Sequence, residues 1–114
     1  LRCLVGSEMC IRDRFATYPE LLLMDEPYGQ LDLDLRFKLE DELIKLWQKT
    51  KTTVIFITHN VEEAVYLGER IMVLTNKPTK VKETISCDLP RPRDVADPRF
   101  VNIRNEVTEL IRWW

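Results

Sequence analysis

Two adjacent carboxylates after one apolar segment, and a histidine after another, are the side chains of this sequence best suited to chemistry. Residues 21–26 read Leu-Leu-Leu-Met-Asp-Glu, so Asp25 and Glu26 follow a run of apolar residues. Residues 54–59 read Val-Ile-Phe-Ile-Thr-His, so His59 follows a second such run. Carboxylates at one strand end and a histidine at another suit a reaction between a metal ion and a phosphate.

The two adjacent carboxylates, Asp25 and Glu26, can have different functions. A carboxylate at the carboxyl end of a parallel strand can hold Mg²⁺, usually through water, because Mg²⁺ dehydrates reluctantly. A second carboxylate one residue later points elsewhere and can orient and deprotonate a water molecule. The alternative interpretation is that Asp25, Glu26 and Pro27 form only a charged strand exit before a turn.

His59 is the only histidine in the chain, which excludes a metal cluster built from histidines. At a strand end its ring could donate to a γ-phosphate oxygen or hold the attacking water. The alternative is a histidine that is hydrogen-bonded locally and takes no part in chemistry.

The segment Gly29-Gln30-Leu31-Asp32 follows directly. Gly29 permits a sharp turn after the acidic pair, and Asp32 could cap the next helix through its side chain. A functional interpretation adds a contact from this segment to a second subunit.

The composition limits the class of protein. The chain has 114 residues, 45% hydrophobic and 32% charged, which fits one globular domain. The net charge of −2 gives no electrostatic reason to expect a nucleic-acid partner. Apolar runs are far shorter than the ~20 residues that span a bilayer. The three cysteines form no metal or disulfide pattern, which favours a reducing compartment.

The elements that must position these residues alternate between strand and helix. Val54–Ile57 is apolar and β-branched, which predicts a strand covered on both faces. Asn60 and Glu63 resemble a capping box for a short helix ending near Gly68. We expect strands at residues 21–25, 54–57 and 71–74, and a more polar edge strand at 80–86. We expect one helix from Asp32 or Asp34 to about Lys49, a short one that begins after Asn60, and a last one that begins at Asp97-Pro98.

This alternation predicts an α/β fold with a mostly parallel sheet and flanking helices. Each of the two longer helices carries an apolar stripe at helical spacing. The stripes comprise Leu35, Leu39, Leu43, Leu46 and Trp47 in the first, and Phe100, Ile103, Val107, Leu110, Ile111 and Trp114 in the last.

The ordered combination of these motifs resembles the nucleotide-binding subunits of ATP-binding cassette (ABC) transporters, which are P-loop NTPases. Residues 21–26 resemble the Walker B strand, with Asp25 in the Mg²⁺ position and Glu26 in the position of the catalytic base. Residues 29–32 resemble the D-loop, and His59 matches the switch histidine that senses the γ-phosphate. Residues 16–114 are thus expected to form the C-terminal part of the ATPase domain.

Four further segments narrow the resemblance to nitrate, sulfonate and taurine importers: Val61–Leu67, Val73–Pro78, Asp88–Asp94 and Asp97–Phe100. The resemblance implies ATP and Mg²⁺ as cofactors, and Gln30 and Asp32 as residues that communicate across an ATP-binding dimer. It implies a second ATPase subunit, membrane permease subunits and a periplasmic solute-binding protein as partners. The subunit would be peripheral, on the cytoplasmic face of the inner membrane.

The chain departs from the family pattern in two places. No Gly-x-x-x-x-Gly-Lys-Ser/Thr loop occurs in it, so no backbone cradle for phosphates is available. Residues 1–15 lie where the family has a Leu-Ser-Gly-Gly-Gln signature, and they stay unassigned. They resemble translated sequencing-adapter read-through. Our hypothesis is that this segment is artefactual.

Two expectations follow from these departures. The chain by itself should neither bind ATP tightly nor hydrolyse it, and its sheet should keep an uncovered face or edge that favours self-association. Two alternatives stay open: a non-catalytic module whose sheet and Trp113-Trp114 helix dock a partner, and an ABC ATPase of a DNA-repair or exporter class.

Overall fold

A computed structural model describes residues 20–29, 31–76 and 79–112. The chain divides into two compact units, residues 1–59 and 60–114, and each unit is described by itself. The unassigned segment 1–15, Gln30 and the Trp113-Trp114 pair lie outside the described residues. Within the described ranges, no helix is both long and apolar enough to cross a membrane.

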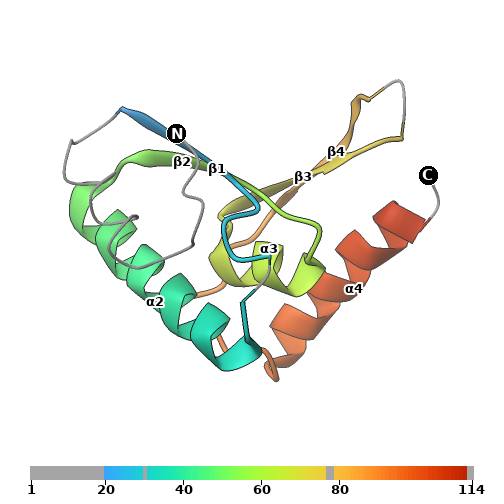
Figure 1. Cartoon of the computed structure of the whole chain (residues 1–114). Helices are drawn as coiled ribbons and strands as arrows, with labels where there is room; N and C mark the ends of the chain where they lie inside the picture. Colours follow the sequence, from blue (N-terminus) through green and yellow to red (C-terminus); the bar gives the residue numbers. More distant parts are fainter. Residues whose placement is uncertain (1–19, 30, 77–78, 113–114) are drawn as a thin grey trace. The chain divides into compact units, whose positions relative to one another are not determined.

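In the first unit, two parallel strands place their carboxyl ends at one edge (Figure 1). Strand β1 (Leu21–Asp25) pairs with β2 (Thr53–Ile57), and helix α2 (Leu33–Thr50) connects them. Leu23 lies opposite Ile55 and Asp25 opposite Ile57. The predicted strands and their parallel pairing are confirmed here.

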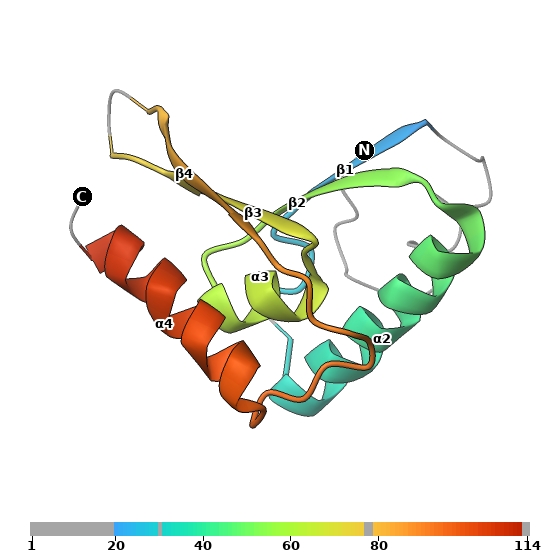
Figure 2. The same cartoon turned by 180° about the vertical axis from the view of Figure 1, so that it is seen from behind.

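Only one face of this pair is covered. Leu22 and Met24 are buried, and α2 lies on one side of the pair in both views (Figure 1, Figure 2). The opposite side chains are about half exposed, so the expectation that residues 54–57 are covered on both faces is wrong. We call this set the apolar sheet face: Leu21, Leu23, Ile55 and Ile57, 43–55% exposed.

Helix α2 follows its predicted stripe except near its start. Leu39 and Leu43 are buried, whereas Leu35 in the first turns is exposed. Asp32 occupies the N-cap position, but its side chain makes no capping hydrogen bond, so the predicted side-chain cap is wrong. The backbone carbonyl of Asp32 instead accepts from the Arg36 amide at 2.8 Å.

The second unit contains an antiparallel hairpin and two helices. Its elements are α3 (Val61–Leu67), β3 (Arg70–Leu74), β4 (Val81–Ser86) and α4 (Pro98–Arg112). Strand β3 pairs with β4 antiparallel, so the described strands form two small sheets, only one of them parallel. The short connection after Leu74 explains this, because parallel partners need a longer crossover.

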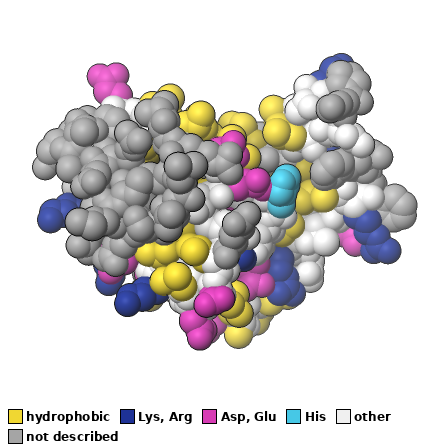
Figure 3. Space-filling model, viewed as in Figure 1, with side chains coloured by type: hydrophobic (Ala, Val, Ile, Leu, Met, Phe, Trp, Pro, Cys, Tyr) yellow, Lys and Arg dark blue, Asp and Glu magenta, His cyan; other side chains and the backbone are white. Residues whose placement is uncertain are grey.

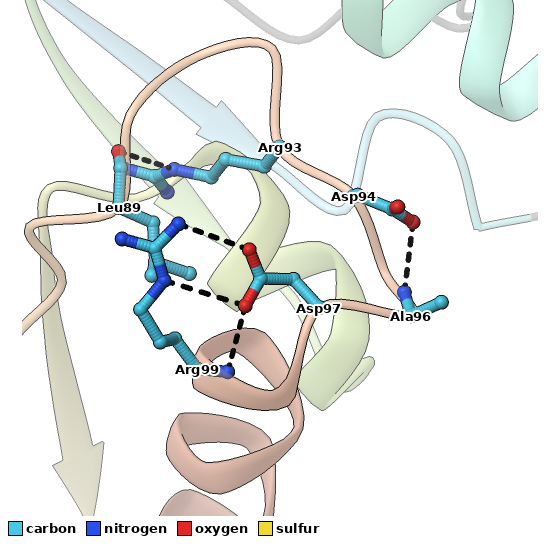
Figure 4. Close-up of polar contacts among 6 residues, drawn as sticks. All are labelled: Leu89, Arg93, Asp94, Ala96, Asp97 and Arg99. Atoms are coloured by element: carbon cyan, nitrogen blue, oxygen red, sulfur yellow. Dashed lines mark hydrogen bonds and ion pairs between the residues drawn. The ribbon is translucent and has the colours of Figure 1, made fainter.

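Helix α4 packs against α3, β3 and β4, and its buried residues are Phe100 and Val107 from the predicted stripe (Figure 2). The predicted start at Asp97-Pro98 is confirmed: Asp97 Oδ1 accepts from the Arg99 amide at 2.8 Å (Figure 4). The Arg99 guanidinium also bonds both carboxylate oxygens of Asp97. These hydrogen bonds lower the pKa of Asp97 and raise that of Arg99.

Two arginines satisfy the carbonyl end of α3, and we call them the arginine clamp. Arg93 is buried, and its Nη1 lies 2.6 Å from both the Val65 and the Gly68 carbonyl oxygens. Its Nε also donates to the Leu89 carbonyl, as Figure 4 shows. Arg91 donates to the Tyr66 and Leu67 carbonyls, and burial, with the nearby charge of Arg93, lowers its pKa.

The start of α3 is also capped. Asn60 Oδ1 accepts from the Glu63 amide at 3.2 Å, which confirms the predicted cap. The helix ends at Gly68, as predicted, where a Cβ atom would lie only 2.8 Å from the Ala64 carbonyl oxygen. A glycine is therefore required for this close approach of the backbone.

Candidate active site

The acidic strand exit and the histidine meet at one edge of the first unit. Nε2 of His59 lies 2.7 Å from Oε1 of Glu26. The register explains the contact, because Glu26 comes one residue and His59 two residues after the carboxyl ends of neighbouring parallel strands. Figure 3 shows the imidazole at the surface beside acidic side chains.

The contact is open to solvent. The His59 side chain is 91% exposed and that of Glu26 is 33% exposed. An exposed ion pair contributes at most about 1 kcal/mol to folding, so stability does not explain the arrangement. A protonated Nε2 can donate a hydrogen bond to the Glu26 carboxylate. The rest of the exposed ring then stays accessible to a ligand from solvent.

Glu26 adopts a backbone conformation that most side chains avoid. Its φ angle is 46°, in the left-handed region. A turn does follow the acidic pair, as predicted, but its left-handed residue is Glu26, and no glycine among the described residues has a positive φ. The strain at Glu26 costs on the order of 1–2 kcal/mol and persists only where neighbouring contacts hold the chain.

Those contacts come from both sides of Glu26. Its amide donates to the Ile57 carbonyl at 2.8 Å, which extends the β1–β2 ladder by one bond. Its carbonyl accepts from the Gly29 amide at 3.4 Å, which closes the turn. The left-handed residue therefore bends the chain at the point where the carboxylate must leave the sheet.

Tyr28 anchors the other end of the turn, and sequence reasoning missed it. The residue is 1% exposed, and its ring centroid lies 5.9 Å from that of Phe56 in β2. Its hydroxyl donates to the Leu39 carbonyl of α2 at 3.4 Å. An aromatic residue inside a polar turn was the available signal, since a loop tip otherwise favours small polar residues.

The other predicted site residues are placed as follows. Asp25 is the last residue of β1 and is exposed. Asp32 is exposed at the N-cap position of α2. Gln30 lies outside the described residues. The roles predicted for these residues and for Glu26 and His59 stay predictions.

The carboxylates of this site supply only part of the ligand set that a magnesium ion needs. Mg²⁺ in phosphate-transfer sites is held by one or two carboxylates, with water and phosphates completing its shell, and an exposed Asp25 suits that use. No cluster of three or more Cys, His, Asp or Glu side chains that could hold a metal occurs within the part of the chain that the structure describes. With Asp25 as a ligand, most of the shell of such an ion would come from water and phosphates.

Comparisons with known proteins define the family. The chain is 44% identical over 106 residues to an uncharacterized ABC transporter ATP-binding protein of Methanocaldococcus jannaschii, covering 93% of this chain and 40% of that protein. It is 46% identical over 100 residues to a putative ATP-binding protein of Brucella melitensis, covering 85% and 42%. No protein-family model matches the chain.

A third relative carries a more specific name. The aliphatic sulfonates import ATP-binding protein SsuB of Bacillus licheniformis is 46% identical over 89 residues, covering 78% of this chain and 35% of that protein. The chain belongs to the ATP-binding proteins of ABC transporters, as the motifs predicted. It spans about two fifths of the length of the curated relatives it matches.

Proposed function

We propose that this chain is the part of an importer ATPase subunit that positions the metal, the hydrolytic water and the phosphate sensor. The transported solute would be a small anion such as nitrate, a sulfonate or taurine. The contact between Glu26 and His59 carries the proposal, because it joins two groups suited to phosphate chemistry at the rim of a parallel pair. The sulfonate-import name of one relative supports the solute class.

Each residue has a defined task in the intact subunit. When Mg²⁺ is bound, its positive charge would neutralise charge on the phosphates. Asp25 would hold that ion through water, and Glu26 would orient the attacking water and accept its proton. His59 would donate to the γ-phosphate oxygen while its contact with Glu26 fixes the ring. Gln30 and Asp32 would communicate across the dimer.

The partners follow from the same proposal. A second ATPase subunit would complete the nucleotide site, and permease subunits with a periplasmic solute-binding protein would select the solute. The subunit would sit on the cytoplasmic face of the inner membrane without spanning it.

The test of this proposal examines first the genomic sequence and then the activity of the subunit that it encodes. The genomic DNA upstream of codon 1 should encode, in frame, Gly-x-x-x-x-Gly-Lys-Ser/Thr, with permease genes adjacent. The subunit expressed from that longer frame should hydrolyse Mg-ATP, and Glu26→Gln should abolish hydrolysis while nucleotide binding is retained. Undiminished hydrolysis in the Glu26→Gln subunit would contradict the proposed role.

The apolar sheet face favours a second candidate, a non-catalytic docking module. In that case Asp25→Asn and Glu26→Gln would leave partner binding unchanged, and titration with Mg²⁺ would not perturb the NMR signals of Asp25. A perturbation by Mg²⁺ that disappears in Asp25→Asn favours the ATPase.

A further inference from the structure

We propose that Tyr28 is a positioning residue for the pair formed by Glu26 and His59. The inference rests on the proposed function, because the pair matters only if these groups act on a ligand. Its first support is location: Tyr28 follows Glu26 by two residues and contacts Phe56, which precedes His59 by three.

The second support is burial. Tyr28 is 1% exposed, although its neighbour Gly29 is exposed and Pro27 is only partly buried. A buried aromatic side chain removes a large apolar area from water, so it can hold a turn whose own hydrogen bonds are long and weak. The bonds within this turn are long, at 3.4 Å from the Gly29 amide and 3.3 Å from the Leu31 amide.

The third support is the strain at Glu26. A left-handed non-glycine residue is kept only where its surroundings determine the backbone on both sides. On the β1 side the amide of Glu26 bonds Ile57. On the other side the buried anchor is Tyr28, tied to β2 through its ring and to α2 through its hydroxyl.

Two of the contacts of Tyr28, through its ring and through its hydroxyl, differ in strength. The ring is tilted by 44° to that of Phe56, and the 5.9 Å between the ring centroids is within the range of about 4.5–7 Å for favourable aromatic pairs. The hydroxyl bond to Leu39 is long at 3.4 Å and is therefore weak. The ring, rather than the hydroxyl, should set the position of the turn, so Tyr28→Phe should preserve the pair and Tyr28→Leu should not.

The test uses the single histidine of this chain as its probe. Ring ¹⁵N and ¹H signals of His59 are recorded in the 114-residue protein without nucleotide, with Glu26→Ala as the reference for a lost contact. Tyr28→Leu should move the signals most of the way to that reference, whereas Tyr28→Phe should leave them near the wild-type positions. Leu43→Ala, a core truncation in α2 of the same unit, is the matched control and should not move them.

The outcomes separate the two proposals. Unchanged His59 signals in a folded Tyr28→Leu protein, or an equal shift in Leu43→Ala, would overturn the positioning role. If Tyr28→Leu does not fold, Phe56→Leu removes the same ring contact from β2 and must shift the signals in the same direction; unchanged signals there also overturn it. No nucleotide is present, so failure of ATP hydrolysis in the longer subunit leaves this result intact.

Discussion

Arg93 of the Pro-Arg-Pro-Arg segment donates to the carbonyl oxygen of Val65 in α3, with 2.6 Å between Nη1 and the oxygen. Further donor contacts reach the carbonyls of Tyr66, Gly68, Cys87 and Leu89. One guanidinium thus joins carbonyls from two separate stretches of the second unit, residues 65–68 and 87–89.

Arg93→Lys should destabilise the protein by about 2–4 kcal/mol, because a lysine lacks the planar fork and leaves buried carbonyls without donors. Urea unfolding measures the change. Arg70→Lys on the exposed start of β3 is the control and should alter stability by no more than about 0.5 kcal/mol. Equal stability of the two variants would show that water can replace the clamp.

Glu26→Gly should be more stable than Glu26→Ala by about 1 kcal/mol. Both variants lose the contact with His59, but only alanine keeps a Cβ atom at a φ of 46°. Comparison of their urea midpoints isolates the backbone strain from the lost contact. An alanine variant as stable as the glycine variant would mean that the turn relaxes out of the left-handed region.

The Asp97 carboxylate should contribute a pH-dependent part of stability. Hydrogen bonds from Arg99 lower the pKa of Asp97 below its ordinary value of 3.8. The stabilisation is therefore present above that value and is lost as the pH falls through the folded-state pKa. The difference in melting temperature between wild type and Asp97→Asn should be largest near neutral pH and should vanish in acid; a difference independent of pH would contradict this.

The apolar sheet face should make the isolated chain self-associate. Sedimentation at rising protein concentration should show species larger than a monomer, and Ile55→Lys should reduce them, because a charge on this face opposes pairing. Gln48→Lys adds the same charge on the exposed side of α2 and should have no effect. Association that survives Ile55→Lys would assign it to another surface.

The 114-residue chain should release no phosphate from Mg-ATP above background. The residues proposed as metal ligand, base and sensor are present, but phosphoryl transfer also requires a cradle for the phosphates, and the sequence contains none. A coupled phosphate assay with purified protein tests this. Turnover that disappears in Glu26→Gln would be the contrary result, and turnover that persists would indicate a contaminant.

The strand and helix boundaries of the first unit were predictable because apolar runs ended in polar residues and helical spacing lay between them. The meeting of Glu26 and His59 follows from one further assumption, that the two strands are parallel neighbours. Their chemical roles are not contained in that pattern, and they stay predictions.

Other features could not be read from the chain. The apolar runs predict strands, but they carry no information about which strand pairs with which, so the hairpin of β3 and β4 was missed. The burial of Arg93 could not be predicted, because nothing in a Pro-Arg-Pro-Arg segment indicates which carbonyls it bonds. The positive φ of Glu26 could not be predicted either, because a residue with positive φ in a turn is usually glycine.

Helix α3 has only 7 residues, whereas isolated helices need about 12–15 residues to persist in water. Its carbonyl end is completed by Arg91 and Arg93, more than twenty positions later in the chain. We therefore expect this helix to become stable during synthesis only after the segment to residue 93 has left the ribosome. A chain that stops before that point would lose a helix well upstream of the missing residues.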